Sequence, residues 1–357
     1  MLVLLPAAER SASAQTAGKS SAPAPDRITV RADLLFYGDN TEFRNPFREG
    51  ETIFGATGRV VVAAALTDRV TVSLGALGNQ RFGGRDAFEL VRPVASLEVR
   101  TARSSFLFGT FPARAEGALT GPDLGGPHGL LPPLQRETLT FDRPYEAGLQ
   151  WTFSSRVLTH EAWLEWQRLN TAEHRERFDA GLAGAWAAGR RMLIPFGLHI
   201  VHEGGQLFAS GPVADSVAAS TGVIVRGRLS RGVTVRTEAQ AVVSRVVPDR
   251  ESPARTRAGA GMFLRASAER APWRAHVIFW RGDDVVKDEG DPNYLSLRRD
   301  GRYYRGIRDY AEAGLTRTFH PAPGVAVMAA ARLHRTERHY EYSYRILGRT
   351  SLGWPVR

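Results

Sequence analysis

The chain has 357 residues, of which 43% are hydrophobic and 24% charged, and it carries a formal net charge of +10. It has no cysteine, which excludes a disulfide scaffold and a thiolate metal site, and no apolar run approaches the ~20 residues of a spanning helix. The basic residues are nearly all arginines, spread along the chain rather than clustered, which argues against a partner nucleic acid.

Residues 1–26 are expected to be a signal-peptide remnant and a flexible lead-in. The apolar run Met1–Ala8 precedes a small-x-small cleavage pattern at Ala12-Ser13-Ala14. A disordered tail is the alternative for this segment. Residues 27–357 are expected to form one domain.

From Arg27 onward, stretches of about ten residues with alternating apolar and polar side chains follow one another, and short and long breaks alternate between them. This pattern predicts an all-β fold, a transmembrane antiparallel up-and-down β-barrel of about 16 strands (14–18), with short periplasmic turns and longer extracellular loops. An even strand number places both termini on the periplasmic side. A soluble β-sandwich or propeller is the alternative, but no blade-length repeat is present and sandwich strands are usually shorter.

The predicted strands follow in chain order. They are Ile28–Tyr37, Thr52–Leu66, Val70–Asn79, Phe88–Arg100, Ser105–Phe111, Pro144–Phe153, Val157–Gln167, Phe178–Ala187, Met192–Val201, Val217–Leu229, Val233–Val243, Arg257–Glu269, Trp273–Trp280, Ile307–Phe319, Gly324–His334 and Tyr340–Trp354. The two longest connections are Pro112–Asp142 and Gly282–Arg305. The first of these either folds inward as a constriction or plug, or projects outward toward a partner.

The two faces of these strands predict different surroundings. One face is apolar, with aromatic residues near strand ends that resemble the girdles of membrane barrels: Tyr145, Trp151, Phe153, Trp166, Trp186, Phe196, Trp273, Phe279, Phe319, Tyr340 and Trp354. The other face is charged and must be wet. The candidate lumen-lining and selectivity residues are Arg31, Arg59, Arg92, Arg100, Arg226, Arg236, Arg265, Arg274, Arg332, Arg345, Glu161 and Glu165. Such an arginine excess favours anions, unless the charges form ion pairs with no net selectivity.

Candidate catalytic constellations are poor. Glu161 and Glu165 share a strand face, but four residues separate them by about 13 Å, too far for a glycosidase pair. His199 and His202 fall on opposite faces of one strand and cannot chelate one metal there. We therefore expect no catalytic residue, no cofactor and no enzymatic activity. The acidic stretch with Asp283, Asp284, Asp288 and Asp291 is expected to be solvated, with calcium binding as the alternative.

Two segments carry a resemblance to a known group. The run Phe36–Phe47, continued by Glu49–Gly55, resembles the first hairpin of uncharacterised porin-like outer-membrane proteins of Gram-negative bacteria, and Tyr145–Trp151 is similar to a later strand of that group. The resemblance implies a fold and a membrane, but no substrate. The C-terminus departs from such barrels, which often end in an aromatic residue, because Pro355-Val356-Arg357 follow Trp354.

These observations predict an outer-membrane channel for passive diffusion of small polar or anionic solutes through an arginine-rich lumen. The expected partners are the lipid bilayer with its lipopolysaccharide and the solutes, with oligomers possible in principle. One alternative is a non-conducting barrel that serves as a surface docking scaffold. Another is a membrane-embedded lipid hydrolase or acyltransferase.

Overall fold

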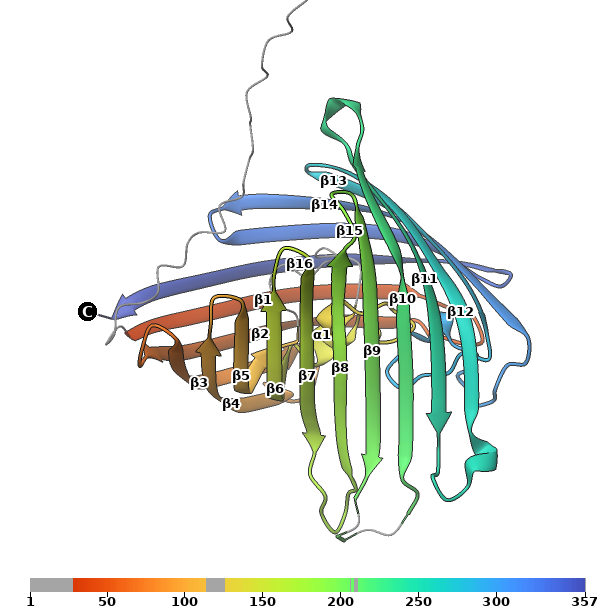
Figure 1. Ribbon diagram of the computed structural model, residues 1–357, viewed down its shortest axis with the longest axis horizontal. Helices are drawn as coiled ribbons and strands as arrows, with labels where there is room; N and C mark the ends of the chain where they lie inside the picture. Colours follow the sequence, from red (N-terminus) through yellow and green to blue (C-terminus); the bar gives the residue numbers. More distant parts are fainter. Residues whose placement is uncertain (1–27, 114–125, 206, 209–210, 357) are drawn as a thin grey trace, which may run out of the picture.

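The computed structural model describes residues 28–113, 126–205, 207–208 and 211–356, so the expected signal segment 1–26 lies outside the described residues. Sixteen strands form in the described part of the chain, each antiparallel to the next, and β1 pairs with β16 to close the ring (Figure 1). The predicted all-β up-and-down barrel is confirmed. Closure leaves no unpaired strand edge, as a hydrocarbon environment requires.

Most strands are longer than predicted, mainly at their loop ends. Their bounds are β1 Ile28–Glu42, β2 Glu51–Ala65, β3 Val70–Arg81, β4 Leu90–Arg100, β5 Ser104–Pro112, β6 Tyr145–Ser154, β7 Leu158–Arg168, β8 Glu176–Ala187, β9 Met192–Gly204, β10 Ala214–Arg228, β11 Thr234–Val247, β12 Arg257–Arg270, β13 Trp273–Asp283, β14 Ile307–Ala322, β15 Val325–Thr336 and β16 His339–Val356. The short helices are η1 Pro127–Gly129, α1 Leu139–Asp142, η2 Ser230–Gly232, η3 Pro253–Arg255 and η4 Pro292–Tyr294.

The connections alternate between short and long, with one exception. The connections on the rim that carries both termini are short, whereas those on the opposite, extracellular rim include the segments 113–144 and 284–306. The exception is the extracellular connection between β15 and β16, where only Glu337 and Arg338 separate the strands and Glu337 turns with a positive φ of 56°. This tight hairpin fixes the register of the two strands just below the extracellular rim.

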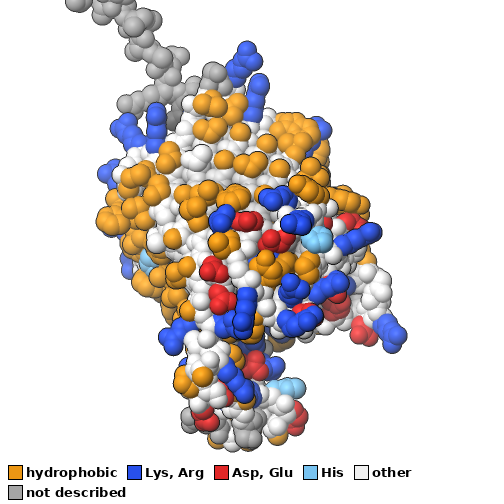
Figure 2. Space-filling view, turned by 90° about the vertical axis from the view of Figure 1, so that its right-hand side faces the viewer, with side chains coloured by type: hydrophobic (Ala, Val, Ile, Leu, Met, Phe, Trp, Pro, Cys, Tyr) orange, Lys and Arg blue, Asp and Glu red, His pale blue; other side chains and the backbone are white. Residues whose placement is uncertain are grey.

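The outer face of the wall is apolar. Exposed side chains such as Val60, Trp186 and Leu333 alternate with inward-facing residues, and Figure 2 shows apolar side chains spread over one face of the wall. We predicted that Tyr145 belongs to the outer aromatic set, and this prediction is wrong. Tyr145 packs inside the barrel against a buried cluster that includes Val61. No helix in the described residues is long and apolar enough to cross a membrane.

The extracellular half of the lumen is filled by the chain's own loops. The described part of the segment 113–144 folds inward, and the α1 residue Phe141 stacks on Tyr37 of β1 at 5.1 Å between ring centroids (Figure 1). The segment 284–306 folds in beside it, held by hydrogen bonds such as Asp291 N to Pro132 O (2.8 Å). Apolar residues of both loops share one buried cluster with inward residues of the wall, Trp280 among them. Of the two orientations predicted for the first loop, the structure therefore has the inward one.

Candidate functional site

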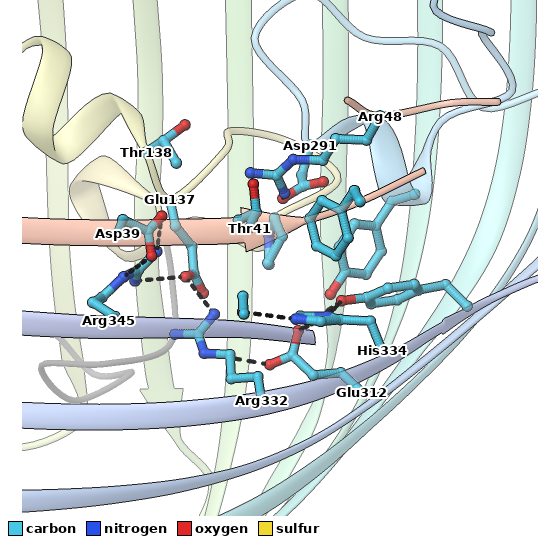
Figure 3. Close-up of a pocket in the computed structure, with 15 residues that line it drawn as sticks. Asp39, Thr41, Arg48, Glu137, Thr138, Asp291, Glu312, Arg332, His334 and Arg345 are labelled. Atoms are coloured by element: carbon cyan, nitrogen blue, oxygen red, sulfur yellow. Dashed lines mark hydrogen bonds and ion pairs between the residues drawn. The ribbon is translucent and has the colours of Figure 1, made fainter. Parts of the chain in front are cut away.

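A narrow cavity of about 20 Å³ lies between the loops and the wall at β1 and β14–β16 (Figure 3). Its lining combines residues of the connections 43–50, 113–144 and 284–306 with inward residues of four strands. They are Asp39, Thr41, Phe43, Arg48, Pro132, Glu137, Thr138, Asp291, Tyr294, Tyr310, Glu312, Arg332, His334, Ser343 and Arg345. Most are polar, which distinguishes this part of the lumen from the apolar cluster beside it.

Strand register brings three of these residues together. Glu312 of β14 is paired directly with His334 of β15, and Ser343 of β16 pairs with Arg332, two residues before His334. All face inward, because side chains two residues apart share a face of the sheet. Diagonal neighbours on paired strands are within reach of each other. Residues separated by 31 positions in the chain thus meet on one patch of the wall.

Hydrogen bonds across this patch form a continuous chain. The Ser343 hydroxyl lies 2.8 Å from Nε2 of His334, and Nδ1 of His334 lies 2.7 Å from the Tyr310 hydroxyl. The Tyr310 hydroxyl donates to Oε2 of Glu312 at 2.7 Å. Its oxygen therefore accepts from Nδ1–H, and Nε2 is left to accept the serine proton. Glu312 Oε2 is also 3.5 Å from Nδ1 directly.

This geometry is that of an activated serine. A serine hydroxyl hydrogen-bonded to a histidine, which a carboxylate orients through its other nitrogen, is the arrangement used for nucleophilic attack on esters and amides. Here the carboxylate acts mainly through a tyrosine hydroxyl. A second histidine, His276, holds the other oxygen of Glu312 at 2.8 Å, so the carboxylate is fixed from both sides. Phe43 packs edge-on against His334 at 4.8 Å and limits its rotation.

Two buried arginines beside the patch are paired with carboxylates. Arg332 and Arg345 each hold Glu137 of the loop, at 2.8 and 2.9 Å, and Arg345 also grips Asp39 through two hydrogen bonds (Figure 3). Burial raises the pKa of Glu137, but the two guanidinium groups outweigh it and hold that pKa below its ordinary value. The network therefore keeps Glu137 ionised and ties the loop to the wall.

A second charged cluster lies deeper against β6–β9 and includes two residues that we predicted to line the lumen. His128 of η1 is held between Glu161 (2.6 Å) and Glu146 (2.9 Å) and stacks on Trp163 at 3.7 Å. Burial lowers the pKa of His128, but the two carboxylates prevail and raise it well above its ordinary value. Glu165, the other predicted lumen residue, is held by Arg143 at 2.9 Å. Glu161 and Glu165 thus serve different partners within one loop-to-wall contact.

The predicted arginines also face inward, but most hold a carboxylate. Arg31, Arg92 and Arg226 are exposed, toward the ends of their strands. Seven of the predicted arginines form ion pairs: Arg59 with Asp33, Arg100 with Glu98, Arg236 and Arg265 with Glu238, Arg274 with Glu269, Arg332 with Glu137 and Arg345 with Asp39. This arrangement resembles the paired alternative more than an open ring of positive charge.

The acidic residues offered as a calcium site do not converge in the structure. Asp284 pairs with Arg257 at 3.3 Å and Asp291 with Arg48 at 2.8 Å, while Asp288 lies 3.6 Å from Arg177. Asp283 is the last residue of β13 and is exposed. Each carboxylate except Asp283 thus has its own arginine, and the segment folds into the lumen instead of standing in solvent as expected.

The comparisons with known proteins give one family match. A model of the family described as lipid A 3'-O-deacylase-type matches residues 20–351. No curated protein sequence matches the chain.

Solved outer-membrane proteins share the fold at low sequence identity. OmpT of Vibrio cholerae, with its loop L8 deleted, is 9% identical, covering 91% of this chain and 99% of that one with a TM-score of 0.56. The in-vitro folded trimer form of OmpT is 9% identical, covering 92% and 100% with a TM-score of 0.54. OprD from Pseudomonas aeruginosa is 12% identical over 92% and 94%, with a TM-score of 0.46. The OmpT likeness supports the fold of an outer-membrane barrel.

The family match overturns one expectation from the sequence. We expected no enzymatic activity and no catalytic residue, but the matched family is described by an enzymatic activity, removal of an ester-linked acyl group. No local motif marks the patch of Glu312, His334 and Ser343, because its members lie on three strands. The register that brings Glu312, His334 and Ser343 together depends on the two-residue turn after β15, where a longer loop was expected.

Proposed function

The chain belongs to the lipid A 3'-O-deacylase-type family, and from that premise we propose that it hydrolyses an acyl ester of an outer-leaflet glycolipid, with Ser343 as the nucleophile. The observation that carries the proposal is the hydrogen-bonded chain from Ser343 through His334 and Tyr310 to Glu312. Lipid A, the molecule in the family's description, is the substrate we propose.

The reaction divides into two transfers. The Ser343 oxygen attacks the ester carbonyl carbon while its proton moves to Nε2 of His334. The ester C–O bond then breaks, and His334 returns the proton to the departing sugar oxygen. Water, deprotonated by the same nitrogen, attacks the acyl-serine and releases the fatty acid. Glu312 stabilises the imidazolium through the Tyr310 hydroxyl.

The site lies on the side of the barrel where outer-leaflet lipid is found. His334 and Ser343 flank the tight extracellular turn at Glu337 and Arg338. The cavity is narrow and covered by loop residues such as Phe43, Pro132 and Tyr294. An ester therefore reaches Ser343 when this cover moves, and the loops act as the gate of the proposed enzyme.

A fluorophosphonate probe tests the proposal, because it labels only activated serines. The refolded barrel in detergent is expected to incorporate one probe at Ser343, identified by peptide mass spectrometry. His334→Ala is expected to abolish the labelling while the barrel still folds. Ser351→Ala is the matched control, because Ser351 lies on the same strand and face with Asp33 as its partner instead of a histidine. Labelling that survives in His334→Ala, or that falls on another serine, contradicts the proposal.

We also propose, as a second function, that small ions cross the barrel. Exposed arginines near the periplasmic ends of the strands support this, Arg31 among them. The inward-folded loops narrow the path on the other side. A planar-bilayer recording under a salt gradient tests it, with steps of anion-selective current as the expected result.

A further inference from the structure

A histidine in the charged cluster against β6–β9 is fully buried, and one of its ring nitrogens has no hydrogen-bond partner among the described residues. His199 of β9 is fully buried, and its Nδ1 lies 3.1 Å from the carbonyl oxygen of Leu134. A carbonyl oxygen only accepts, so Nδ1 carries the hydrogen and Nε2 presents a lone pair. Nε2 has no hydrogen-bond partner among the described residues.

Two carboxylate oxygens face this lone pair. Asp179 Oδ2 of the neighbouring strand β8 lies 3.6 Å from Nε2, and Glu289 Oε2 of the loop 284–306 lies 3.9 Å from it. The two strands are adjacent in the wall (Figure 1). Glu289 Oε2 likewise lacks a hydrogen-bond partner in the described part of the chain. Three electron-rich atoms thus face one point, at separations too long for a hydrogen bond between them.

The remaining atoms of these side chains are already engaged. Asp179 Oδ1 accepts from the indole of Trp163 at 3.1 Å, and Glu289 Oε1 is held by Arg143 at 2.8 Å. The carbonyl of Leu134 fixes the imidazole ring. Such outer contacts orient the ligands of metal sites and set the histidine tautomer.

Several buried carboxylates gather around the point and share a few cations, among them Arg177, which lies 3.4 Å from Glu289 Oε1. Oxygens of Glu146, Glu165 and Asp179 lie within 4.8 Å of one another in the interior. Arg143 reaches the latter two, and His128 holds the first. Buried carboxylates at this spacing repel strongly unless a further positive charge joins them.

We propose that Asp179, His199 and Glu289 bind a divalent transition-metal ion, Zn²⁺ or Mn²⁺. Bonds of about 2.0–2.2 Å in a tetrahedral site place neighbouring ligand atoms roughly 3.4 Å apart, close to the observed separations. One imidazole and two carboxylates suit these ions, and no sulfur ligand is needed. Glu289 belongs to the segment 284–306, whereas Asp179 and His199 belong to the wall. The bound ion therefore holds this inward-folded segment against the barrel. This role is independent of the proposed hydrolysis.

Metal uptake during refolding tests the proposal. The full chain is refolded in detergent with Zn²⁺ or Mn²⁺, freed of excess ion, and its metal content measured. The wild type is expected to retain one ion, and Asp179→Asn and His199→Ala to lose it with affinities at least tenfold lower. His202→Ala is the control, because it removes a histidine from the same strand that pairs with Asp215 outside the cluster.

Folding is monitored by the heat-modifiable mobility of the barrel on a gel. If a wall variant does not fold, Glu289→Gln gives the same test from the loop and is expected to lose the ion. Three results overturn the proposal. They are a wild type that retains neither ion, retention that persists in Asp179→Asn or Glu289→Gln, and a loss in His202→Ala equal to that in His199→Ala.

Discussion

The two halves of β16 show how differently one face of one strand is used. Toward the extracellular rim, the side chains of Glu341, Ser343 and Arg345 are buried against the inward-folded loops. Each forms a buried hydrogen bond with another side chain. Toward the periplasmic rim, Arg349 and Ser351 point to the same side and are exposed. The alternation of side chains is the same in both halves.

The difference lies in what the strand meets inside the lumen. A buried charge must be paired and hydrogen-bonded, and loss of one partner leaves the other uncompensated. A charge in a wet lumen is solvated, and an ion pair there contributes little to stability. The extracellular half is therefore a preorganised interior that can support chemistry, whereas the periplasmic half resembles a solvated vestibule.

The largest expected effect is on stability and compares two arginines of β16. Arg345→Ala leaves Asp39 and Glu137 buried with fewer partners and is expected to lower the free energy of unfolding by about 3–5 kcal/mol. Arg349→Ala, in the exposed half, is expected to cost less than about 1 kcal/mol. Urea unfolding in lipid vesicles measures both. Equal costs would remove the distinction between the halves.

The next effect concerns the tyrosine link inside the buried half. Tyr310→Phe removes the hydroxyl that joins His334 to Glu312 and is expected to lower kcat for ester hydrolysis by roughly 100-fold, with little change in KM. Tyr340→Phe is the control. It removes a tyrosine hydroxyl near the start of β16, where Tyr340 is exposed. A drop confined to KM would mean that Tyr310 binds substrate and does not position the base.

Acid is expected to loosen the buried half selectively. Burial raises the pKa of Glu289, but the Arg143 guanidinium outweighs it and lowers that pKa from 4.5 to about 2. A carboxyl with a lowered folded-state pKa stabilises the fold fully above about pH 4.5, and this contribution is lost as the pH falls toward 2. Glu137 has a pKa shifted in the same direction.

Hydrogen exchange of the segment 284–306 measures this loss. Protection is expected to be constant from pH 7 to 5 and to fall between about pH 4.5 and 2. Glu289→Gln should show weaker protection already at pH 7 and a smaller further decline. Protection that falls as the pH rises would contradict a lowered pKa for the Glu289 carboxyl.

The smallest expected effect belongs to the exposed half. Arg31→Glu combined with Arg349→Glu should lower the anion-to-cation permeability ratio by about twofold, because solvated charges act only through the local potential. Arg335→Glu serves as the control. It makes the same kind of charge change, but Arg335 is exposed on the outer face of β15, near the extracellular turn. An unchanged reversal potential in the double variant would show that the vestibule does not govern ion passage.

The fold was predictable because period-two alternation and turn spacing are local properties. Arg59 and Val60, for example, fall on the faces that the pattern assigns to them. Strand ends were less predictable, since Gly38–Glu42 reads as a loop but extends β1 once it pairs with β16. Tyr145 was misplaced because an aromatic near a strand end fits a girdle as well as an inner cluster.

The candidate site was not predictable by inspection of local motifs. Ser343, His334 and Glu312 become neighbours only through register, and the tight turn after β15 that sets this register lay where a longer loop was expected. The sequence did not decide whether the loop residues 126–142 fold inward, because their composition suits contact with a partner as well as packing in the lumen. The pairing of several arginines depended on that course, and their effect on ion selectivity stays a prediction.

The most direct test of the central claim is the acyl composition of lipid A in cells that produce the barrel. Mass spectrometry is expected to show the loss of one ester-linked acyl chain with the wild type and with Ser351→Ala, and intact lipid A with Ser343→Ala at equal amounts of folded barrel. Lipid A that is intact with the wild type, or deacylated equally by Ser343→Ala, would contradict the account.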